Sequence, residues 1–226
     1  YPHITLNLLE KDLTLEELVA AGSVPDMVFT GPDFLASIRQ MDYPKDLTEL
    51  VKKANMDLTR IDPFTINRVN VDGKLHGMPF GKNLGVMFYN KDIFDHFALD
   101  YPHDEMTGEE VIDYHRKITR VEDGVHYIGW APGFPDAIAS TFAIPFADAE
   151  TKMANINNDV YQRVFTLMRE AYETPGFKNE NNKFNYGWSQ FVGDHTVGML
   201  TEWSNKLIGR LEEAEINGTA PNWDMA

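Results

Sequence analysis

Residues 72–94 constrain the fold of this chain more than any other segment. Asp72-Gly73 is a tight-turn dipeptide between polar and apolar residues, and it predicts a hairpin. Pro79 has no N–H to donate to a sheet, so strand pairing starts or stops beside it. The apolar run 84–89 predicts a strand, and the polar residues 90–92 open an amphipathic helix. A hairpin, a strand and a helix are therefore expected in close succession.

Helical patterns alternate with short apolar runs along the rest of the chain. Thr14 with Glu17, and Thr107 with Glu110, have the capping-box spacing that marks helix starts. Strands are predicted at residues 4–9, 27–29, 127–130 and 196–200, and helices at residues 14–21, 33–41, 47–54, 64–69, 91–97, 107–119, 159–173, 186–192 and 204–213. The run 27–29 is typical of a buried parallel strand. This alternation indicates the α/β class with open, largely parallel sheets.

Composition excludes several classes of function. The 226 residues are 43% hydrophobic, which is enough for one large domain or for two modest lobes with separate cores. The formal net charge of −15, with no basic stretch to offset it, opposes binding to nucleic acid. The absence of cysteine removes disulfides, thiol catalysis and most zinc sites. No run of about 20 apolar residues occurs, so no membrane span is predicted.

The sequence lacks the motifs of the common catalytic and cofactor sites. Its 7 histidines are scattered and form no pair with a metal-ligand spacing. There is no calcium-binding loop, phosphate-binding loop, nucleophile elbow or glycine-rich dinucleotide fingerprint. The aspartates beside turns and helix starts are explained by capping. We therefore predict no catalytic residue, no metal site and no cofactor.

Several motifs taken together resemble one known family. The hairpin segment matches the family pattern that leads into a strand crossing between two lobes, in residues Asp72, Gly73, Lys74, Gly77, Pro79, Tyr89, Asn90, Lys91, Asp92 and Phe94. Further matches lie at residues 22–26, 46–50 and 191–203. The chain thus resembles the extracellular solute-binding proteins of ABC importers, in particular the sugar-binding, maltose-binding-protein-like branch. Gly108 stands where the family commonly has Trp, which predicts a loosely anchored helix start.

The resemblance implies a two-lobed, periplasmic-binding-protein-like (type II) fold of the α/β class. Each lobe is expected to be a mostly parallel sheet flanked by helices. Residues 1–83 would form a partial first lobe that lacks its N-terminal strand and late helices, and residues 84–226 a nearly complete second lobe. The match covers nearly all of this chain but only part of a family member, so the chain is expected to be truncated at both ends.

The resemblance also implies a function. Members of the family bind a small solute between their lobes and deliver it to the permease subunits of an ABC importer, closing about a hinge. For this chain the expected ligand is a carbohydrate or oligosaccharide, bound in an interlobe cleft without catalysis. The expected location is extracellular, at the cell surface, as a membrane-anchored lipoprotein or a periplasmic protein. A monomer is expected, with no nucleic-acid partner.

The resemblance places one group of ligand contacts before and on the crossing strand. The loop after residues 27–29 supplies Thr30 and Asp33. The carboxylate of Asp33 can accept two hydroxyl hydrogens at once, which suits a sugar diol, but it suits the capping of the next helix equally well. Asn83 can both donate and accept, as a sugar hydroxyl does. For Lys82 and Asn83 the alternative is a contact that satisfies the sheet or the hinge.

Aromatic residues at the ends of two strands complete the predicted ligand site. Trp203, which follows Glu202, is expected to stack on a sugar ring, with a place in the core as the alternative. Trp130 and Phe134 follow another strand, in a loop that varies among family members. Trp188 lies on a predicted helix and is expected in the core, so Trp203→Ala should weaken ligand binding more than Trp188→Ala. The predicted ligand-binding residues are Thr30, Asp33, Lys82, Asn83, Trp130, Phe134, Glu202 and Trp203.

Two other functions stay open at this point. The excess of acidic residues, 35 Asp and Glu against 20 Lys and Arg, permits a glycoside hydrolase that uses two carboxylates across a cleft. A surface adhesion or signalling module on the same fold is the other possibility. Release of shorter sugars from labelled oligosaccharides would identify a hydrolase. Pull-down of the permease would separate a transport protein from an adhesion module.

Overall fold

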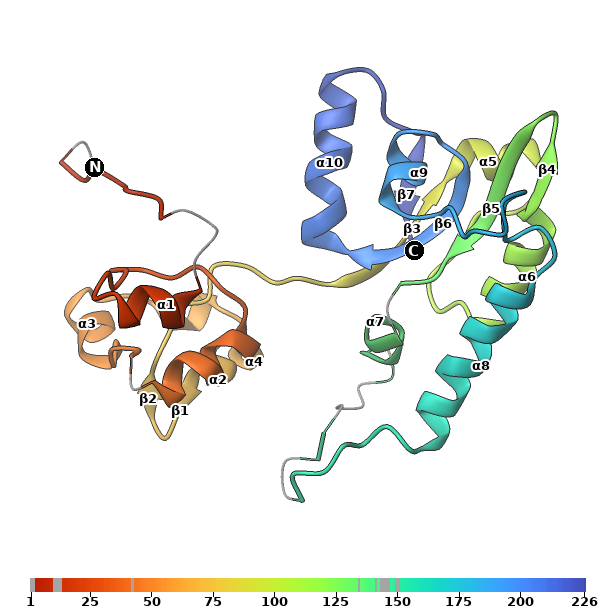
Figure 1. The fold of residues 1–226 in the computed structure, drawn as a ribbon. Helices are drawn as coiled ribbons and strands as arrows, with labels where there is room; N and C mark the ends of the chain where they lie inside the picture. Colours follow the sequence, from red (N-terminus) through yellow and green to blue (C-terminus); the bar gives the residue numbers. More distant parts are fainter. Residues whose placement is uncertain are drawn as a thin grey trace. The chain divides into compact units, whose positions relative to one another are not determined.

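The chain divides into two units, Tyr1–Lys82 and Asn83–Ala226 (Figure 1). The computed structural model describes residues 3–9, 14–41, 43–133, 135–140, 142, 147–148 and 151–226. The assignment of these units to a partial first lobe and a nearly complete second lobe stays a prediction. In the described part of the chain, no helix has both the length and the apolar character required to cross a bilayer.

A five-stranded sheet of order β4-β5-β6-β3-β7 organises the second unit. Its strands are β3 (Gly85–Asn90), β4 (Arg120–Glu122), β5 (Val125–Ala131), β6 (Val197–Trp203) and β7 (Trp223–Met225). β5 and β6 run parallel, whereas β3 is antiparallel to both β6 and β7, and β4 is antiparallel to β5. The α/β class is confirmed, but the expectation of a mostly parallel sheet is wrong for this unit. One cause is the tight turn Asp123-Gly124, which can join only antiparallel neighbours.

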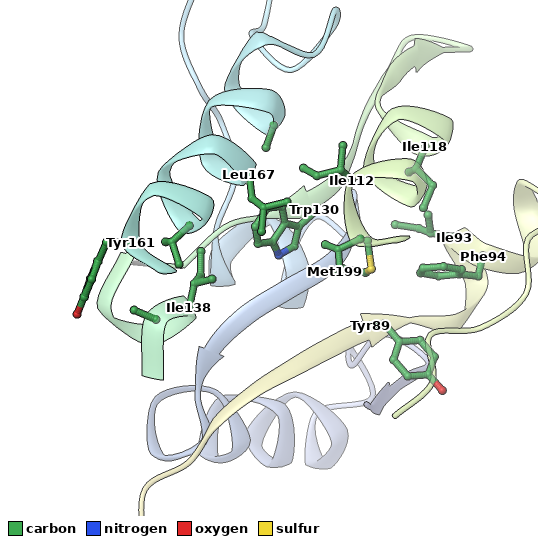
Figure 2. Close-up of a cluster of buried hydrophobic side chains, with 14 residues drawn as sticks. Tyr89, Ile93, Phe94, Ile112, Ile118, Trp130, Ile138, Tyr161, Leu167 and Met199 are labelled. Carbon is green, nitrogen blue, oxygen red and sulfur yellow. The ribbon is translucent and has the colours of Figure 1, made fainter. Parts of the chain in front are cut away.

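Two helical layers cover the two faces of this sheet. Neighbouring strand residues point to opposite faces, so on β3 Phe88 packs into one apolar cluster and Tyr89 into the other. The helices of the first layer are α5 (Lys91–His96), α6 (Gly108–Ile118), α7 (Pro135–Ser140) and α8 (Asp159–Glu173), and those of the second are α9 (Trp188–Val192) and α10 (Ser204–Ile216) (Figure 1). Figure 2 shows the first cluster, in which Ile112 and Leu167 of the helices meet Trp130 of β5.

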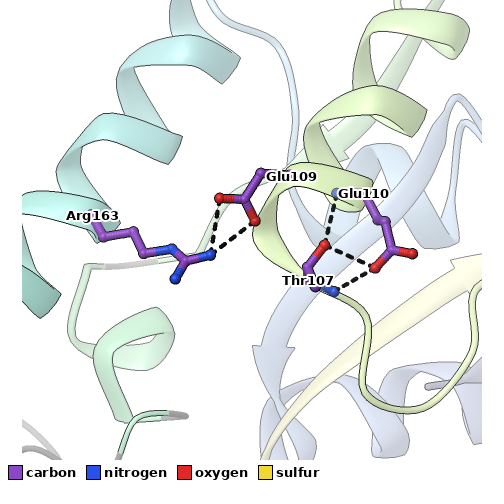
Figure 3. Close-up of polar contacts among 4 residues, drawn as sticks. All are labelled: Thr107, Glu109, Glu110 and Arg163. Carbon is purple, nitrogen blue, oxygen red and sulfur yellow. Dashed lines mark hydrogen bonds and ion pairs between the residues drawn. The ribbon is translucent and has the colours of Figure 1, made fainter.

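The start of α6 is well anchored, which contradicts the loose start expected from Gly108. Thr107 Oγ1 accepts a hydrogen bond from the backbone N–H of Glu110 at 3.2 Å (Figure 3). The Glu110 carboxylate in turn accepts one from the backbone N–H of Thr107 at 2.7 Å. This capping box satisfies two of the N–H groups that a helix start leaves without partners. The predicted helix start at Thr107 is therefore confirmed.

The same end of α6 is also held against α8. Glu109 and Arg163 form an ion pair at 2.9 Å between the two helices (Figure 3). A Cβ on Gly108 would lie 2.5 Å from Cδ1 of Leu167. Gly108 therefore lets α6 approach α8 closely, so the missing aromatic anchor is replaced by direct helix packing.

A buried histidine joins α6 to β5 and α8. His115 Nδ1 accepts a hydrogen bond from the backbone N–H of Trp130 at 2.9 Å, and Nε2 donates to the carbonyl oxygen of Ala171 at 3.1 Å. These partners require the neutral Nε2–H tautomer, and burial lowers the pKa of His115 to about 4. Gly129 makes this contact possible, because a Cβ there would lie 2.5 Å from Cα of His115.

The first unit consists of short elements. They are α1 (Leu15–Ala20), α2 (Pro32–Gln40), α3 (Thr48–Lys53), the 3-10 turn η1 (Leu58–Arg60), α4 (Pro63–Val69), β1 (Asn70–Val71) and β2 (Lys74–Leu75). β1 and β2 form the predicted hairpin, and Asp72 and Gly73 have φ values of 52° and 77°, as a two-residue turn requires. The predicted hairpin and the four predicted helices of this unit are confirmed.

Two strands predicted in the first unit are wrong. Residues 4–9 and 27–29 are irregular, and their apolar side chains lie on the surface, with Phe29 75% exposed. A buried strand needs hydrogen-bonding neighbours on its edges and apolar layers on its faces. Among the described residues of this unit, the only sheet is the pairing of β1 with β2, so these segments have no ladder to join.

Candidate functional site

A pocket of about 380 Å³ opens beside the carboxyl ends of β5 and β6. The two strands are parallel, so the residues that follow them meet at one edge of the sheet, where open α/β sheets bind ligands. We call this the β6 pocket. Its lining residues are Pro132, Gly133, Pro135, Met168, Tyr172, Tyr186, Gly187, Trp188, Leu200, Thr201 and Glu202.

Three aromatic side chains supply one part of this lining. Trp188, the first residue of α9, is 46% exposed. The hydroxyl groups of Tyr172 and Tyr186 are hydrogen-bonded at 2.5 Å. Burial, together with that hydrogen bond, raises the pKa of Tyr186, so its hydroxyl stays protonated. The three rings offer apolar faces, and the two tyrosines add hydroxyl groups.

The polar part of the β6 pocket comes from the end of β6. The side chain of Glu202 is 17% exposed, its Oε1 accepts from the backbone N–H of Trp203 at 2.8 Å, and it lies 3.7 Å from Lys206 Nζ. Thr201 Oγ1 accepts from the indole N–H of Trp130 at 2.9 Å, which leaves its own hydroxyl hydrogen to donate. The lining therefore includes a carboxylate acceptor and a hydroxyl donor, on neighbouring residues of β6 whose side chains point to opposite faces of the sheet.

This combination of groups suits a neutral ligand rich in hydroxyl groups. Aromatic faces stack on the apolar face of a sugar ring, and a carboxylate accepts hydroxyl hydrogens. Among the described lining residues Glu202 is the only one with a formal charge, so an anionic ligand would be opposed. Within the described residues no group of three or more His, Cys, Asp or Glu is placed to hold a metal ion.

A smaller pocket of about 200 Å³ lies in the first unit, next to the hairpin of β1 and β2. Its lining contains two basic residues, Arg39 and Lys74, and one acidic residue, Asp72, so its charge is mixed. Apart from the ring of His76, its lining has no aromatic surface on which a ligand could stack. The β6 pocket is therefore the better candidate for a ligand site.

The predicted contacts of the first unit lie outside the β6 pocket. Thr30 is an exposed residue of irregular backbone. Asp33 lies in the first turn of α2, whose N-cap residue is Gly31, so Asp33 does not occupy the N-cap position. Lys82 forms an ion pair with Asp62. A ligand contact by any of the three predicted residues stays a prediction.

Asn83 supports a helix in this structure. Its Oδ1 accepts hydrogen bonds from Oγ of Ser204 at 3.2 Å and from the backbone N–H of Asn205 at 3.1 Å. The N-cap residue of α10, Trp203, has no side chain that can cap, so Asn83 takes over that role from a distant part of the chain. The amide nitrogen of Asn83 is left to bind ligand, and that contact stays a prediction.

Trp130 lies inside β5 and not after it, which corrects its expected place. It is 4% exposed, and its ring belongs to the core shown in Figure 2. Its contribution to the β6 pocket is the indole hydrogen bond that orients Thr201. Direct stacking of Trp130 on a ligand stays a prediction that this burial does not favour. Phe134 lies outside the described residues.

Of Trp188 and Trp203, the structure places Trp188 at the pocket and Trp203 outside its lining. Trp203 ends β6, is half-buried and does not line the β6 pocket, although Glu202 beside it does. Trp188 was expected in the core, and this is wrong, since it is nearly half exposed and lines the pocket. The available signal was Gly187, which lies inside the predicted helix 186–192 but is the N-cap residue of α9, with a φ of 144° that residues with side chains rarely adopt, so Trp188 is the first residue of the helix.

Comparison with known proteins shows one family and one fold. The family model described as bacterial extracellular solute-binding protein matches residues 13–226. The ABC substrate-binding protein Lmo0181 from Listeria monocytogenes, in complex with cycloalternan, has a TM-score of 0.76 at 18% identity, over 93% of this chain and 54% of that one. CpMnBP1 with mannotriose bound gives 0.72 at 22% identity, over 94% and 56%.

A third structure agrees with these two. An ABC transporter solute-binding protein from Agrobacterium radiobacter K84, in complex with ribitol, gives a TM-score of 0.66 at 20% identity, over 93% of this chain and 54% of that one. The chain therefore spans little more than half the length of the solved structures that it matches.

Proposed function

The chain belongs to the bacterial extracellular solute-binding protein family, and on that premise we propose that it binds a carbohydrate or oligosaccharide and delivers it to an ABC importer. The observation that carries the proposal is the β6 pocket, in which aromatic rings and a single carboxylate converge at the carboxyl ends of parallel strands. The solved relatives support the ligand class, since their bound molecules include cycloalternan, mannotriose and ribitol.

The groups of the β6 pocket can account for a useful affinity. A dissociation constant near 1 μM corresponds to about −8 kcal/mol. Aromatic stacking contributes about 0.5–1.5 kcal/mol per ring beyond area burial, and a hydrogen bond to a charged group about 1.5–3 kcal/mol. One stacked ring on Trp188 and hydrogen bonds to Glu202 and Thr201 supply about 2.5–6 kcal/mol of this, and the burial of apolar sugar surface has to supply the rest and offset the ordering costs.

We propose that the chain is a binding protein and not an enzyme. A glycoside hydrolase needs two carboxyl groups facing one bond. Among the described residues, Glu202 is the only acidic residue that lines the β6 pocket, and its carboxylate is engaged by Trp203 and Lys206. Incubation with labelled oligosaccharides should leave them intact. The appearance of shorter sugars would overturn the proposal in favour of a hydrolase.

The family is extracellular, and for this protein we propose a place at the cell surface, as a membrane-anchored lipoprotein or a periplasmic protein. The expected partners are the permease subunits of an ABC importer, with the protein acting as a monomer. Affinity capture with the sugar-loaded protein should recover the permease. Capture of host surface proteins in its place would support the adhesion or signalling alternative.

Calorimetric titration with mannotriose and ribitol tests the ligand proposal, and tryptophan variants locate the site. Because Trp188 lines the β6 pocket and Trp203 does not, we now expect Trp188→Ala to weaken mannotriose binding by about tenfold and Trp203→Ala by less. Phe165→Ala, which truncates a half-exposed ring of α8 that does not line the pocket, is the matched control and should bind normally. A larger loss of affinity in Trp203→Ala than in Trp188→Ala would instead indicate that the ligand binds at Trp203.

A further inference from the structure

The indole ring of Trp188 is covered by a cation from a neighbouring helix. The guanidinium carbon of Arg210, on α10, lies 4.2 Å from the centre of the Trp188 ring. Arg210 is not among the residues that line the β6 pocket, whereas Trp188 is. The guanidinium group therefore packs on Trp188 without occupying the space that a ligand would fill.

This contact can restrain the side chain of Trp188, which is otherwise weakly held. A half-exposed Trp at the first position of a five-residue helix has few neighbours to hold its side chain in one rotamer. A guanidinium group at this distance from the ring centre is attracted by the π-electrons of the ring, and its apolar stem can pack beside it. Arg210 also donates a hydrogen bond from Nη1 to the carbonyl oxygen of Lys206, which ties the guanidinium to its own helix.

The helix that carries Arg210 is itself fixed in the fold. The backbone N–H of Ser204 donates to the carbonyl oxygen of Leu84 at 2.8 Å, and Oγ of Ser204 accepts from the backbone N–H of Leu84 at 3.1 Å. Asn83 holds the first N–H groups of α10, as described above. Leu207 and Leu211, on either side of Arg210 along the helix, are fully buried in the core. Arg210 therefore projects from a rigid element.

We propose that Arg210 is a positioning residue that holds the Trp188 ring as a stacking platform, so that the β6 pocket favours cyclic sugars over linear polyols. The inference rests on the proposed function for its ligand, but the positioning itself can be measured without any ligand. A pyranose ring has a flat apolar face that an ordered indole can cover. A linear polyol has no such face, so its binding depends on hydroxyl partners such as Glu202 and gains little from an ordered ring.

The first experiment measures the order of Trp188 in the absence of sugar. Hydroxyl-radical footprinting with mass spectrometry reports oxidation of Trp188 in wild type, Arg210→Met and Arg210→Lys. Oxidation of Trp188 should rise in Arg210→Met, which keeps the apolar stem and removes the cation, and should return toward the wild-type level in Arg210→Lys. Arg169→Met makes the same chemical change at an exposed residue of α8 and should leave Trp188 unaltered. Unchanged oxidation in Arg210→Met would overturn the positioning role.

The second experiment measures selectivity by calorimetry with mannotriose and ribitol. In Arg210→Met the affinity for mannotriose should fall by about three- to tenfold, whereas affinity for ribitol should stay within about twofold of wild type. Equal loss for both ligands would indicate general damage to the pocket and overturn the selectivity, as would a wild-type protein that prefers ribitol. If the wild type bound neither mannotriose nor ribitol, the proposed function would be in question. Footprinting would still decide whether Arg210 positions Trp188.

Discussion

The two units of the chain differ in how far they bury their large apolar side chains. Among the described residues, the largest fully buried side chains all belong to the second unit, and they include Phe88, Phe94 and Ile112. Among its described residues the first unit buries only four apolar side chains, those of Leu15, Leu35, Ile38 and Leu75, and it leaves others such as Phe29 and Phe80 largely in contact with solvent. One unit thus carries a core on each face of a sheet, whereas the other holds together mainly through local turns and short helices.

This difference shows what an apolar run needs in order to become a strand. Residues 86–89 and residues 27–29 are both short apolar segments, yet only the first is paired. β3 has β6 on one side and β7 on the other, and helices cover both faces of the sheet. For residues 27–29 the described part of the first unit offers no such neighbours. Strand formation is therefore a property of the surroundings as much as of the segment.

The largest expected difference between the units comes from phenylalanine truncation. Phe88→Ala removes a ring that is 0% exposed and should lower the free energy of unfolding by about 3–5 kcal/mol. Phe80→Ala removes a ring that is 78% exposed and should change it by no more than about 0.5 kcal/mol. Urea denaturation provides the measurement, followed by tryptophan fluorescence for Phe88→Ala, because all 4 tryptophans lie in the second unit, and by far-UV circular dichroism for Phe80→Ala, because the first unit has helices but no tryptophan.

A similar loss from both phenylalanine variants would break the comparison. It would mean that Phe80 is packed in solution and that the first unit has a core of its own. Tryptophan fluorescence of Phe80→Ala provides the control, since it reports the second unit alone and should not change.

The second expected effect is a pH dependence that belongs to the second unit. His115 is buried and neutral with a pKa of about 4, whereas an exposed histidine in the unfolded chain titrates near 6.5. Between these values the unfolded chain binds a proton that the folded chain does not, so stability falls as the pH drops from about 6.5 to about 4. The total loss should be about 3 kcal/mol, at about 1.4 kcal/mol per pH unit.

His115→Asn separates this effect from acid titration of the carboxylates. The variant should be less stable at neutral pH, because the hydrogen bond to Ala171 is lost, but its stability should be nearly flat between pH 6.5 and about 5. Carboxylates such as that of Glu110, whose pKa is lowered from 4.5 by hydrogen bonds from Thr107, lose their contribution only as the pH falls toward and below that value, so they overlap the acid end of the window alone. A wild type with no slope in this range would show that the ring is charged or accessible when folded.

Local signals were readable from the sequence, and signals that depend on distant partners were not. The capping box at Thr107 contains its own hydrogen-bond partners within four residues, so the start of α6 could be predicted. Asn83 could not be interpreted in this way, because the helix that it caps begins far along the chain at Ser204. Its residue type suggested a ligand contact, whereas the fold uses its carbonyl oxygen for support.

The candidate site was predicted in part for the same reason. Glu202 could be selected because it ends an apolar strand at the edge where ligands bind, and it does line the β6 pocket. The sequence predicts Trp188 in the core because it lies on a predicted helix and Trp is highly buried on average. Its exposure depends on Gly187, on α10 and on Arg210, none of which helical periodicity can reveal.

The smallest expected effect compares two identical caps, one in each unit. Thr14 with Glu17 and Thr107 with Glu110 form full capping boxes, so Thr→Ala removes the same hydrogen bonds in both helices. Thr107→Ala should lower the free energy of unfolding measured by tryptophan fluorescence by about 1 kcal/mol, because α6 packs on the core of the second unit. Thr14→Ala should leave that transition unchanged, since only Leu15 of α1 is buried, and should appear instead as faster amide hydrogen exchange within α1. A shift of the fluorescence transition by Thr14→Ala would show that the two units unfold as one, and the independence that the other comparisons assume would be lost.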